Sequence, residues 1–138
     1  MNSRPQELEL YAELVRALRS GKSLDRATLV LDWGSIPREV GAKMMVFEDG
    51  SILGTVGGGC GEAEVWQEAM EVFETRCPRR VEVDLTEDQS SDSGKVCGGR
   101  FEVFLDFWPP DSAALTCLAR VLEEEQLALL ETYLGPVP

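Results

Sequence analysis

Residues 43–65, KMMVFEDGSILGTVGGGCGEAEV, combine two short apolar runs, a turn, a glycine-rich loop and an acidic segment. Asp49-Gly50 is a hairpin signal, so residues 43–47 and 51–56 are predicted to be paired strands. The segment after the loop has apolar residues at helical spacing: Ala63, Trp66, Met70 and Phe73. The stretch therefore predicts a hairpin whose second strand leads through bare backbone into a helix.

Similar patterns flank this stretch on both sides. A helix is predicted upstream from the spacing of Leu8, Tyr11, Val15 and Leu18, and residues 27–31 form a short apolar strand. Alternating strands at 81–85 and 101–107 follow downstream. Residues 111–138 then form a helix that either continues to the end or gives way to a last strand. The pattern predicts an α/β fold, with helices packed on a mixed β-sheet in a single compact domain covering residues 1–138.

Composition excludes several classes of function. The chain has 138 residues, 25 acids and 13 bases, a net charge of −12, which disfavours nucleic acids and anionic membranes. No apolar run reaches the roughly 20 residues of a membrane span, and the start does not resemble a secretory signal, so we expect a cytoplasmic protein. Without histidine or a CxxC pair, a zinc finger, a c-type haem site and a histidine-based triad find no support.

The glycine-rich loop is the first candidate binding element. Gly57, Gly58 and Gly59 precede Cys60 at a strand-to-helix junction, where free amides and a helix N-terminus suit an oxyanion such as phosphate. A connecting turn normally needs one glycine, so three favour a ligand. The loop lacks the Gly-Lys-Ser/Thr of a Walker loop and the GxGxxG spacing of dinucleotide sites. Glu62 either joins this site or favours the helix as a first-turn acid.

Two further glycine-bearing loops lie next to predicted strands. The first holds Gly34, Ser35 and Arg38, and the other holds Cys97, Gly98 and Gly99 after the polar, exposed loop 86–95. Arginine suits phosphate, and a helix start or flanking glycines favour a reactive or ligand-contacting thiol at Cys60 and Cys97. If the loops converge, they enclose a pocket for a phosphate-bearing, sulfur-coordinated cofactor. Packing is the expected role of Cys77 and Cys117.

Three motifs in this order, GSIPREVGAKM, DGSILGTVGGGCGEAEV and VCGGRFEVF, resemble the amino-terminal domain of the XdhC/CoxI family over roughly residues 8–107. The resemblance implies an accessory protein of molybdenum hydroxylases such as xanthine dehydrogenase and carbon monoxide dehydrogenase. Its implied role is to bind the molybdenum cofactor (molybdopterin), support sulfuration of the cofactor and insert it into the apo-enzyme. A cofactor-delivery chaperone is therefore expected rather than an enzyme.

The resemblance, together with the loops, gives a candidate cofactor-binding set: Gly34, Ser35, Arg38, Gly57, Gly58, Gly59, Cys60, Glu62, Cys97, Gly98 and Gly99. Of these, Cys60 and Cys97 are expected to approach the molybdenum or carry transferable sulfur. Two positions depart from the family pattern. Gly61 replaces a bulky apolar residue, which predicts a looser turn after Cys60, and Asp32 adds negative charge near the proposed anion site.

The resemblance also suggests partners. Longer members continue into a Rossmann-like domain; none is expected within this chain, so a separate subunit is one partner that the sequence allows. The others are an apo molybdenum hydroxylase, a sulfurtransferase and a second copy in a homodimer. Two other functions stay open: a thiol-redox protein using Cys60 and Cys97, whose Cα atoms would need to lie within about 7 Å, and an interaction module with an empty pocket.

Overall fold

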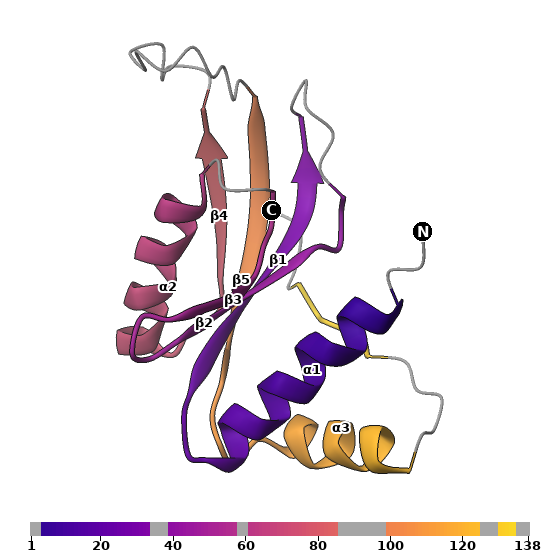
Figure 1. The fold of residues 1–138 in the computed structure, drawn as a ribbon. Coiled ribbons are helices and arrows are strands. Elements are labelled where there is room, and N and C mark those ends of the chain that lie inside the picture. Colours follow the sequence, from indigo (N-terminus) through magenta and orange to yellow (C-terminus); the bar gives the residue numbers. More distant parts are fainter. Residues whose placement is uncertain (1–3, 34–38, 58–60, 86–98, 125–129, 135–138) are drawn as a thin grey trace. The chain divides into compact units, whose positions relative to one another are not determined.

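The computed structural model describes residues 4–33, 39–57, 61–85, 99–124 and 130–134 (Figure 1). Along these residues the order of elements is α1 (Arg4–Arg19), β1 (Leu24–Asp32), β2 (Lys43–Phe47), β3 (Ile52–Gly54), α2 (Glu62–Thr75), β4 (Arg79–Asp84), β5 (Arg100–Trp108) and α3 (Ala113–Glu123). The predicted α/β class, with helices packed on a β-sheet, is confirmed.

The chain divides into two compact units, which we call the terminal-helix unit and the sheet unit. The terminal-helix unit comprises Met1–Lys22 and Pro109–Pro138, and in it Arg19 of α1 forms an ion pair of 2.6 Å with Glu123 of α3. The sheet unit, Ser23–Trp108, contains the five strands and α2. It also contains all the predicted site residues.

The sheet has the strand order β3-β2-β1-β5-β4. All four strand pairings among the described residues are antiparallel, so the sheet that was expected to be mixed contains no parallel pair in this part of the chain. The reason is the topology: α2 connects the two edge strands, β3 and β4, and these do not pair with each other. The connection that contains α2 therefore passes over one face of the sheet, where α2 itself packs on β1, β5 and β4.

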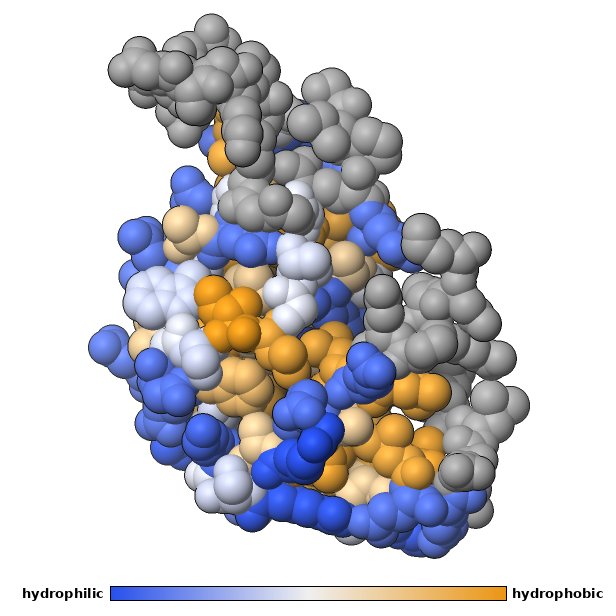
Figure 2. Space-filling model, in the orientation of Figure 1, coloured by the Kyte–Doolittle hydropathy of each residue, from blue (hydrophilic) through white to orange (hydrophobic). Residues whose placement is uncertain are grey.

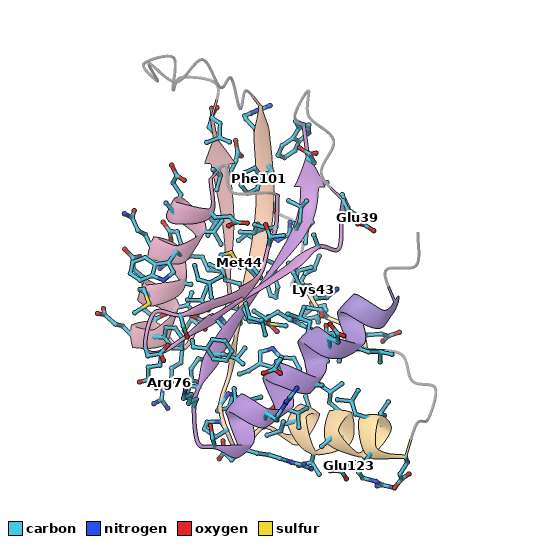
Figure 3. All side chains as sticks on the ribbon, in the orientation of Figure 1. Glu39, Lys43, Met44, Arg76, Phe101 and Glu123 are labelled. Atoms are coloured by element: carbon cyan, nitrogen blue, oxygen red, sulfur yellow. The ribbon has the colours of Figure 1, made fainter. Side chains whose placement is uncertain are left out.

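A continuous apolar core lies between α2 and the sheet. The helix contributes Val65, Ala69 and Val72, which are fully buried, with Trp66, Met70 and Phe73 partly buried beside them. Met44 and Phe101 meet them from the sheet (Figure 3). The outward side of α2 is mainly hydrophilic (Figure 2). Trp66, Met70 and Phe73, which the helical spacing predicted to face the core, therefore lie at the border of the buried face. The fully buried residues are those directly before them in the sequence.

A β-bulge in β1 reverses the alternation of its side chains. Up to Leu29 the odd-numbered residues face α2, as the buried Ala27 and Leu29 show. The register then jumps, with Leu29 opposite Val103 and Leu31 opposite Glu102, so Val30 is the extra residue. Beyond it Leu31 lies on the face away from α2, and Asp32, opposite Phe101, lies on the α2 face.

The remaining predicted elements agree in place and differ in length. The strand at 43–47 has the predicted ends, whereas β3 covers only Ile52–Gly54 of the predicted 51–56. The third helix begins after Ser112, within the predicted segment 111–138, and ends at Glu123. In the tail, residues 130–134 form neither helix nor strand, and the rest beyond 124 lies outside the described residues. The polar loop 86–95 also lies outside them.

Asp25 is a fully buried acid on the α2 side of the sheet. By register it lies between Val46 and Phe107, and neither of its carboxylate oxygens has a hydrogen-bond partner. Desolvation, followed by repulsion from Asp106, raises the pKa of Asp25 to about 8. Asp106 itself accepts hydrogen bonds from Arg26 and Trp108. The neutral acid is therefore the favoured form of Asp25 near neutral pH.

This burial predicts a pH-dependent stability. The unfolded protein loses the Asp25 proton near pH 4 and the folded protein near pH 8. The contribution of Asp25 to the unfolding free energy is therefore greatest below about pH 4 and falls as the pH rises from 4 to 8. Against an Asp25→Asn variant, we expect wild type to lose up to about 1.4 kcal/mol of unfolding free energy per pH unit. Urea unfolding between about pH 5 and pH 8 measures this. Parallel curves for the two proteins would contradict it.

Candidate functional site

Three of the eleven predicted site residues lie in the described part of the chain: Gly57, Glu62 and Gly99. The other eight lie outside it: Gly34, Ser35, Arg38, Gly58, Gly59, Cys60, Cys97 and Gly98. The described residues that flank the three loops show where each loop leaves the sheet unit. Backbone hydrogen bonds and close contacts connect these flanking residues from one strand to the next.

The first and third loops leave from adjacent strands at one end of the sheet. The amide of Trp33, just before Gly34, donates a hydrogen bond of 2.8 Å to the carbonyl oxygen of Arg100. Gly99, at the end of the third loop, accepts a hydrogen bond of 2.9 Å from the amide of Leu85, where that loop begins. One backbone hydrogen bond therefore joins the start of the first loop to the residue after the third, and the other joins the two ends of the third loop.

The glycine-rich loop ends at the same place. It enters α2 through Gly61, which lies against the ring of Phe101, the second residue of β5. A Cβ added at Gly61 would lie 2.7 and 2.8 Å from two ring carbons of Phe101 and 3.0 Å from a methyl carbon of Val83. The end of β4, the start of β5 and the start of α2 are therefore in contact. This arrangement places the described flanks of all three loops at one end of the sheet unit.

The same contact corrects the expectation of a looser turn after Cys60. Gly61 has a φ of 82°, in the left-handed region, and no space for a side chain. A bulky apolar residue in this conformation would collide with the Phe101 ring. The glycine therefore allows α2 to approach the sheet closely, and the turn at Gly61 is tight.

Glu62 holds the strand side of the glycine-rich loop. Its Oε1 accepts a hydrogen bond from the hydroxyl of Thr55 and one of 3.3 Å from the amide of Val56. Thr55 Oγ1 in turn accepts a 3.3 Å hydrogen bond from the amide of Gly57. The carboxylate thus clasps the two ends of the loop, from Thr55 to Glu62. In the described residues its contacts are with Thr55 and the loop backbone, whereas the sequence left open whether Glu62 joins the binding site or favours the helix as a first-turn acid.

The N-terminus of α2 has the features of an anion site. Its N-cap residue is Gly61, which provides no side chain to cap the first-turn amides. Such amides, together with the helix dipole, attract a phosphate or another oxyanion. Opposing this are two acids in the first turn, Glu62 and Glu64. The clasp with Thr55 directs the first of these toward the loop backbone.

The cysteines divide differently from the prediction. Cys77 and Cys117 were expected to be packed, yet both are exposed and free, because Cys77 follows the end of α2 and Cys117 lies on the outer side of α3. In the described residues no three acidic, cysteine or histidine side chains gather as metal ligands. None of the helices described here is long and apolar enough to span a membrane.

Sequence reasoning missed two residues of this region, Thr55 and Phe101. Thr55 is an exposed hydroxyl after a short strand, and no helical or strand periodicity relates it to a glutamate seven residues later. Phe101 was recognised only as one apolar residue of an alternating strand. A glycine directly before a predicted helix was the available signal, since it indicates close approach of the helix to a neighbour.

Gly61→Ala tests the contact with Phe101, and Gly41→Ala is its matched control. Both glycines have positive φ, but a Cβ at Gly41 meets nothing within 4 Å. We expect Gly41→Ala to cost about 1 kcal/mol of unfolding free energy and Gly61→Ala about 2–4 kcal/mol, because a collision is added to the same backbone strain. Denaturant unfolding measures both. Equal losses would show that the Phe101 ring yields freely.

The clasp is tested by Thr55→Val, with Thr55→Ser as its control. Valine keeps the shape but removes the donor to Glu62 and the acceptor for the Gly57 amide, whereas serine keeps both. We expect Thr55→Val to lower the unfolding free energy by about 1 kcal/mol and to speed hydrogen exchange at the Gly57 amide. If serine and valine variants exchange this amide equally fast, the hydroxyl does not hold the loop.

Residues 17–84 match the family described as XdhC and CoxI family. The chain is 48% identical over 59 residues to the molybdenum cofactor insertion chaperone PaoD of Escherichia coli (strain K12), covering 43% of this chain and 19% of PaoD. It is 32% identical over 98 residues to the uncharacterized protein YqeB of the same organism, covering 71% of this chain and 18% of YqeB.

A solved structure has a similar fold. A crystal structure described as a xanthine dehydrogenase from Bacillus halodurans superposes with a TM-score of 0.64 at 32% identity, covering 83% of this chain and 34% of that one. The chain thus spans less than a fifth of the two curated relatives and about a third of the solved chain.

Proposed function

We propose that this chain, whose residues 17–84 belong to the XdhC and CoxI family, binds the molybdenum cofactor and helps to insert it into a molybdenum hydroxylase. The structural observation that carries the proposal is the meeting of the loop flanks at one end of the sheet unit. There Trp33 is bonded to Arg100, and Gly61 lies against Phe101. The similarity to a named insertion chaperone supports the choice of cofactor.

The residues present fit the phosphate of molybdopterin. The uncapped first-turn amides of α2 offer donors for an oxyanion, without a side chain at Gly61 to block approach. We assign the amides of Gly58 and Gly59 to the same role. We assign Arg38 and Ser35 as further phosphate donors. When bound, the cofactor supplies a molybdenum centre and a dithiolene. Cys60 and Cys97 are assigned to the sulfur and metal side of this ligand.

Glu62 acts here as a positioning residue. A carboxylate facing the ligand would repel a phosphate, and its hydrogen bonds to Thr55 and Val56 direct it to the backbone instead. The two described ends of this loop are thereby held together before binding, which lowers the entropy lost when a ligand is bound there. With a chain charge of −12, such local donors have to outweigh a repulsive overall field.

The proposed partner is the cofactor-free hydroxylase, and the proposed role is delivery without catalysis. An acidic surface favours association with a basic patch on that enzyme. A sulfurtransferase that loads Cys60 or Cys97, a separate Rossmann-like subunit and a homodimer are further proposed associations, and a cytoplasmic location is proposed with them. A disulfide between Cys60 and Cys97 is the competing thiol-redox function.

Anaerobic titration with molybdopterin tests the proposal. We expect wild type to bind the cofactor and Cys60→Ala or Cys97→Ala to weaken binding by about tenfold or more, as loss of a metal-site contact typically does. Cys117→Ala is the control because Cys117 is an exposed thiol in the terminal-helix unit. Activation of the apo-hydroxylase is measured in parallel.

Three other results of these measurements would change the proposed function. No binding by wild type would contradict cofactor delivery and leave the interaction module. Undiminished binding and delivery by both variants would remove the thiols from the mechanism. A Cys60–Cys97 disulfide that forms and is reduced reversibly, with no cofactor affinity, would establish the redox function instead.

A further inference from the structure

The bulge in β1 exposes two large apolar side chains on the sheet face away from α2. Without the extra Val30, Leu31 would pair opposite Phe101 and face the core; with it, Leu31 lies opposite Glu102. Trp33, two residues on, lies on the same face as Leu31. Leu31 is 44% exposed and Trp33 48% exposed. A bulge that moves two large apolar groups from core to solvent is costly to stability unless another molecule covers them.

The Trp33 side chain is held in place by its neighbour on β5. The guanidinium carbon of Arg100 lies 5.2 Å from the centre of the indole ring, and the Trp33 amide is bonded to the Arg100 carbonyl oxygen. Arg100 also contacts Glu82 at 3.4 Å. Tryptophan and arginine are the residues most often found to dominate binding at protein interfaces. A tryptophan that is already ordered loses little entropy on binding.

Acidic side chains border this pair on the same face. Register places Glu82 opposite Glu102, and Asp84 opposite Arg100, on the adjacent strands β4 and β5. Glu82 and Asp84 are exposed, whereas Glu102 is bound to Arg80 at 2.8 Å. Glu82, Asp84 and Glu102 carry three negative charges and Arg80 and Arg100 two positive ones, so the patch has a net negative charge. A second copy of the chain would bring the same acids together, so a basic partner fits better.

We propose that Leu31 and Trp33 form the docking surface for the cofactor-free hydroxylase, which would present an apolar pocket bordered by lysine or arginine. The inference rests on the proposed function and gives it a location. Trp33 directly precedes the first loop and is bonded to the residue that follows Gly99, so this surface is continuous with the loop end of the sheet unit. A protein docked here lies next to the loops assigned to the cofactor, where a ligand can pass without release to solvent.

Leu31→Ser and Trp33→Ala test the docking surface, with Ile52→Ser as the matched control. Ile52 is 46% exposed, also lies in a strand of the sheet unit, and faces the α2 side by its register with Val46. The probe is the purified cofactor-free molybdenum hydroxylase of the same organism. We expect Leu31→Ser and Trp33→Ala each to weaken its binding by about tenfold or more, and Ile52→Ser to leave it unchanged. Thermal unfolding confirms that each variant is folded.

A second measurement separates this inference from the proposed function. Molybdopterin affinity of Leu31→Ser is expected to equal that of wild type, since Leu31 belongs to the docking surface alone. If wild type binds both cofactor and hydroxylase, and the two variants bind the hydroxylase as tightly as Ile52→Ser does, the docking surface is wrong and cofactor delivery stands. If wild type binds neither, the proposed function fails with it.

The acidic residues Glu82 and Asp84 allow an independent test of the same docking surface. Glu82→Gln combined with Asp84→Asn is expected to slow association with the hydroxylase and to flatten its dependence on salt, with little change in the dissociation rate. An unchanged salt dependence would contradict the acidic border. Wild-type self-association that Leu31→Ser abolishes would identify a second copy as the occupant and overturn the choice of partner.

Discussion

The approach of α2 to the sheet at Gly61 is the constraint on which the candidate site depends. Because no Cβ separates the helix backbone from the Phe101 ring, the start of α2 lies against the end of β4 and the start of β5. The glycine-rich loop, which leads into α2, therefore ends beside the third loop, which connects β4 and β5. Hydrogen bonds at Trp33 and Leu85 extend the same arrangement to β1 and to the third loop. The absence of a side chain at Gly61 therefore allows the ends of three loops, distant in the sequence, to meet where a ligand site is proposed.

In the proposed function, the two faces of the sheet unit carry separate tasks. On one face α2 covers the apolar core and points its N-terminus at the loop end. On the other face, beyond the bulge, β1 turns Leu31 and Trp33 outward. The two faces meet at the strand ends, so holding a ligand and recognising a protein can occupy neighbouring positions without sharing side chains. This difference between the two faces depends on Val30, the extra residue of the bulge in β1.

Most elements of the fold could be predicted because their apolar periodicity is regular. The strand at Lys43–Phe47 and the helix after the glycine-rich loop followed from a hairpin turn and from helical spacing. The bulge could not, because residues 27–31 are uniformly apolar or small and contain no alternation that a shifted register would break. The isolation of Asp25 was equally hidden, since an acid in a strand normally faces solvent.

The site residues were less predictable than the fold, since their roles depend on contacts between distant segments. Glycines and cysteines in three loops indicated a shared site, and the described flanks of these loops do lie together. The contact of Glu62 with Thr55 could not be predicted, because the two residues lie on opposite sides of the loop, seven positions apart. Cys77 and Cys117 were misjudged because a cysteine near a helix end or on a helix gives no sequence signal of its exposure.

The neutral state of Asp25 alters the thermodynamics of unfolding as well as its extent. Near pH 7 the native chain carries one negative charge fewer than its composition suggests, because this acid keeps its proton. Unfolding therefore releases that proton to the buffer. The calorimetric heat of unfolding will include the ionisation enthalpy of the buffer chosen, and two buffers of different ionisation enthalpy will report different heats for one transition.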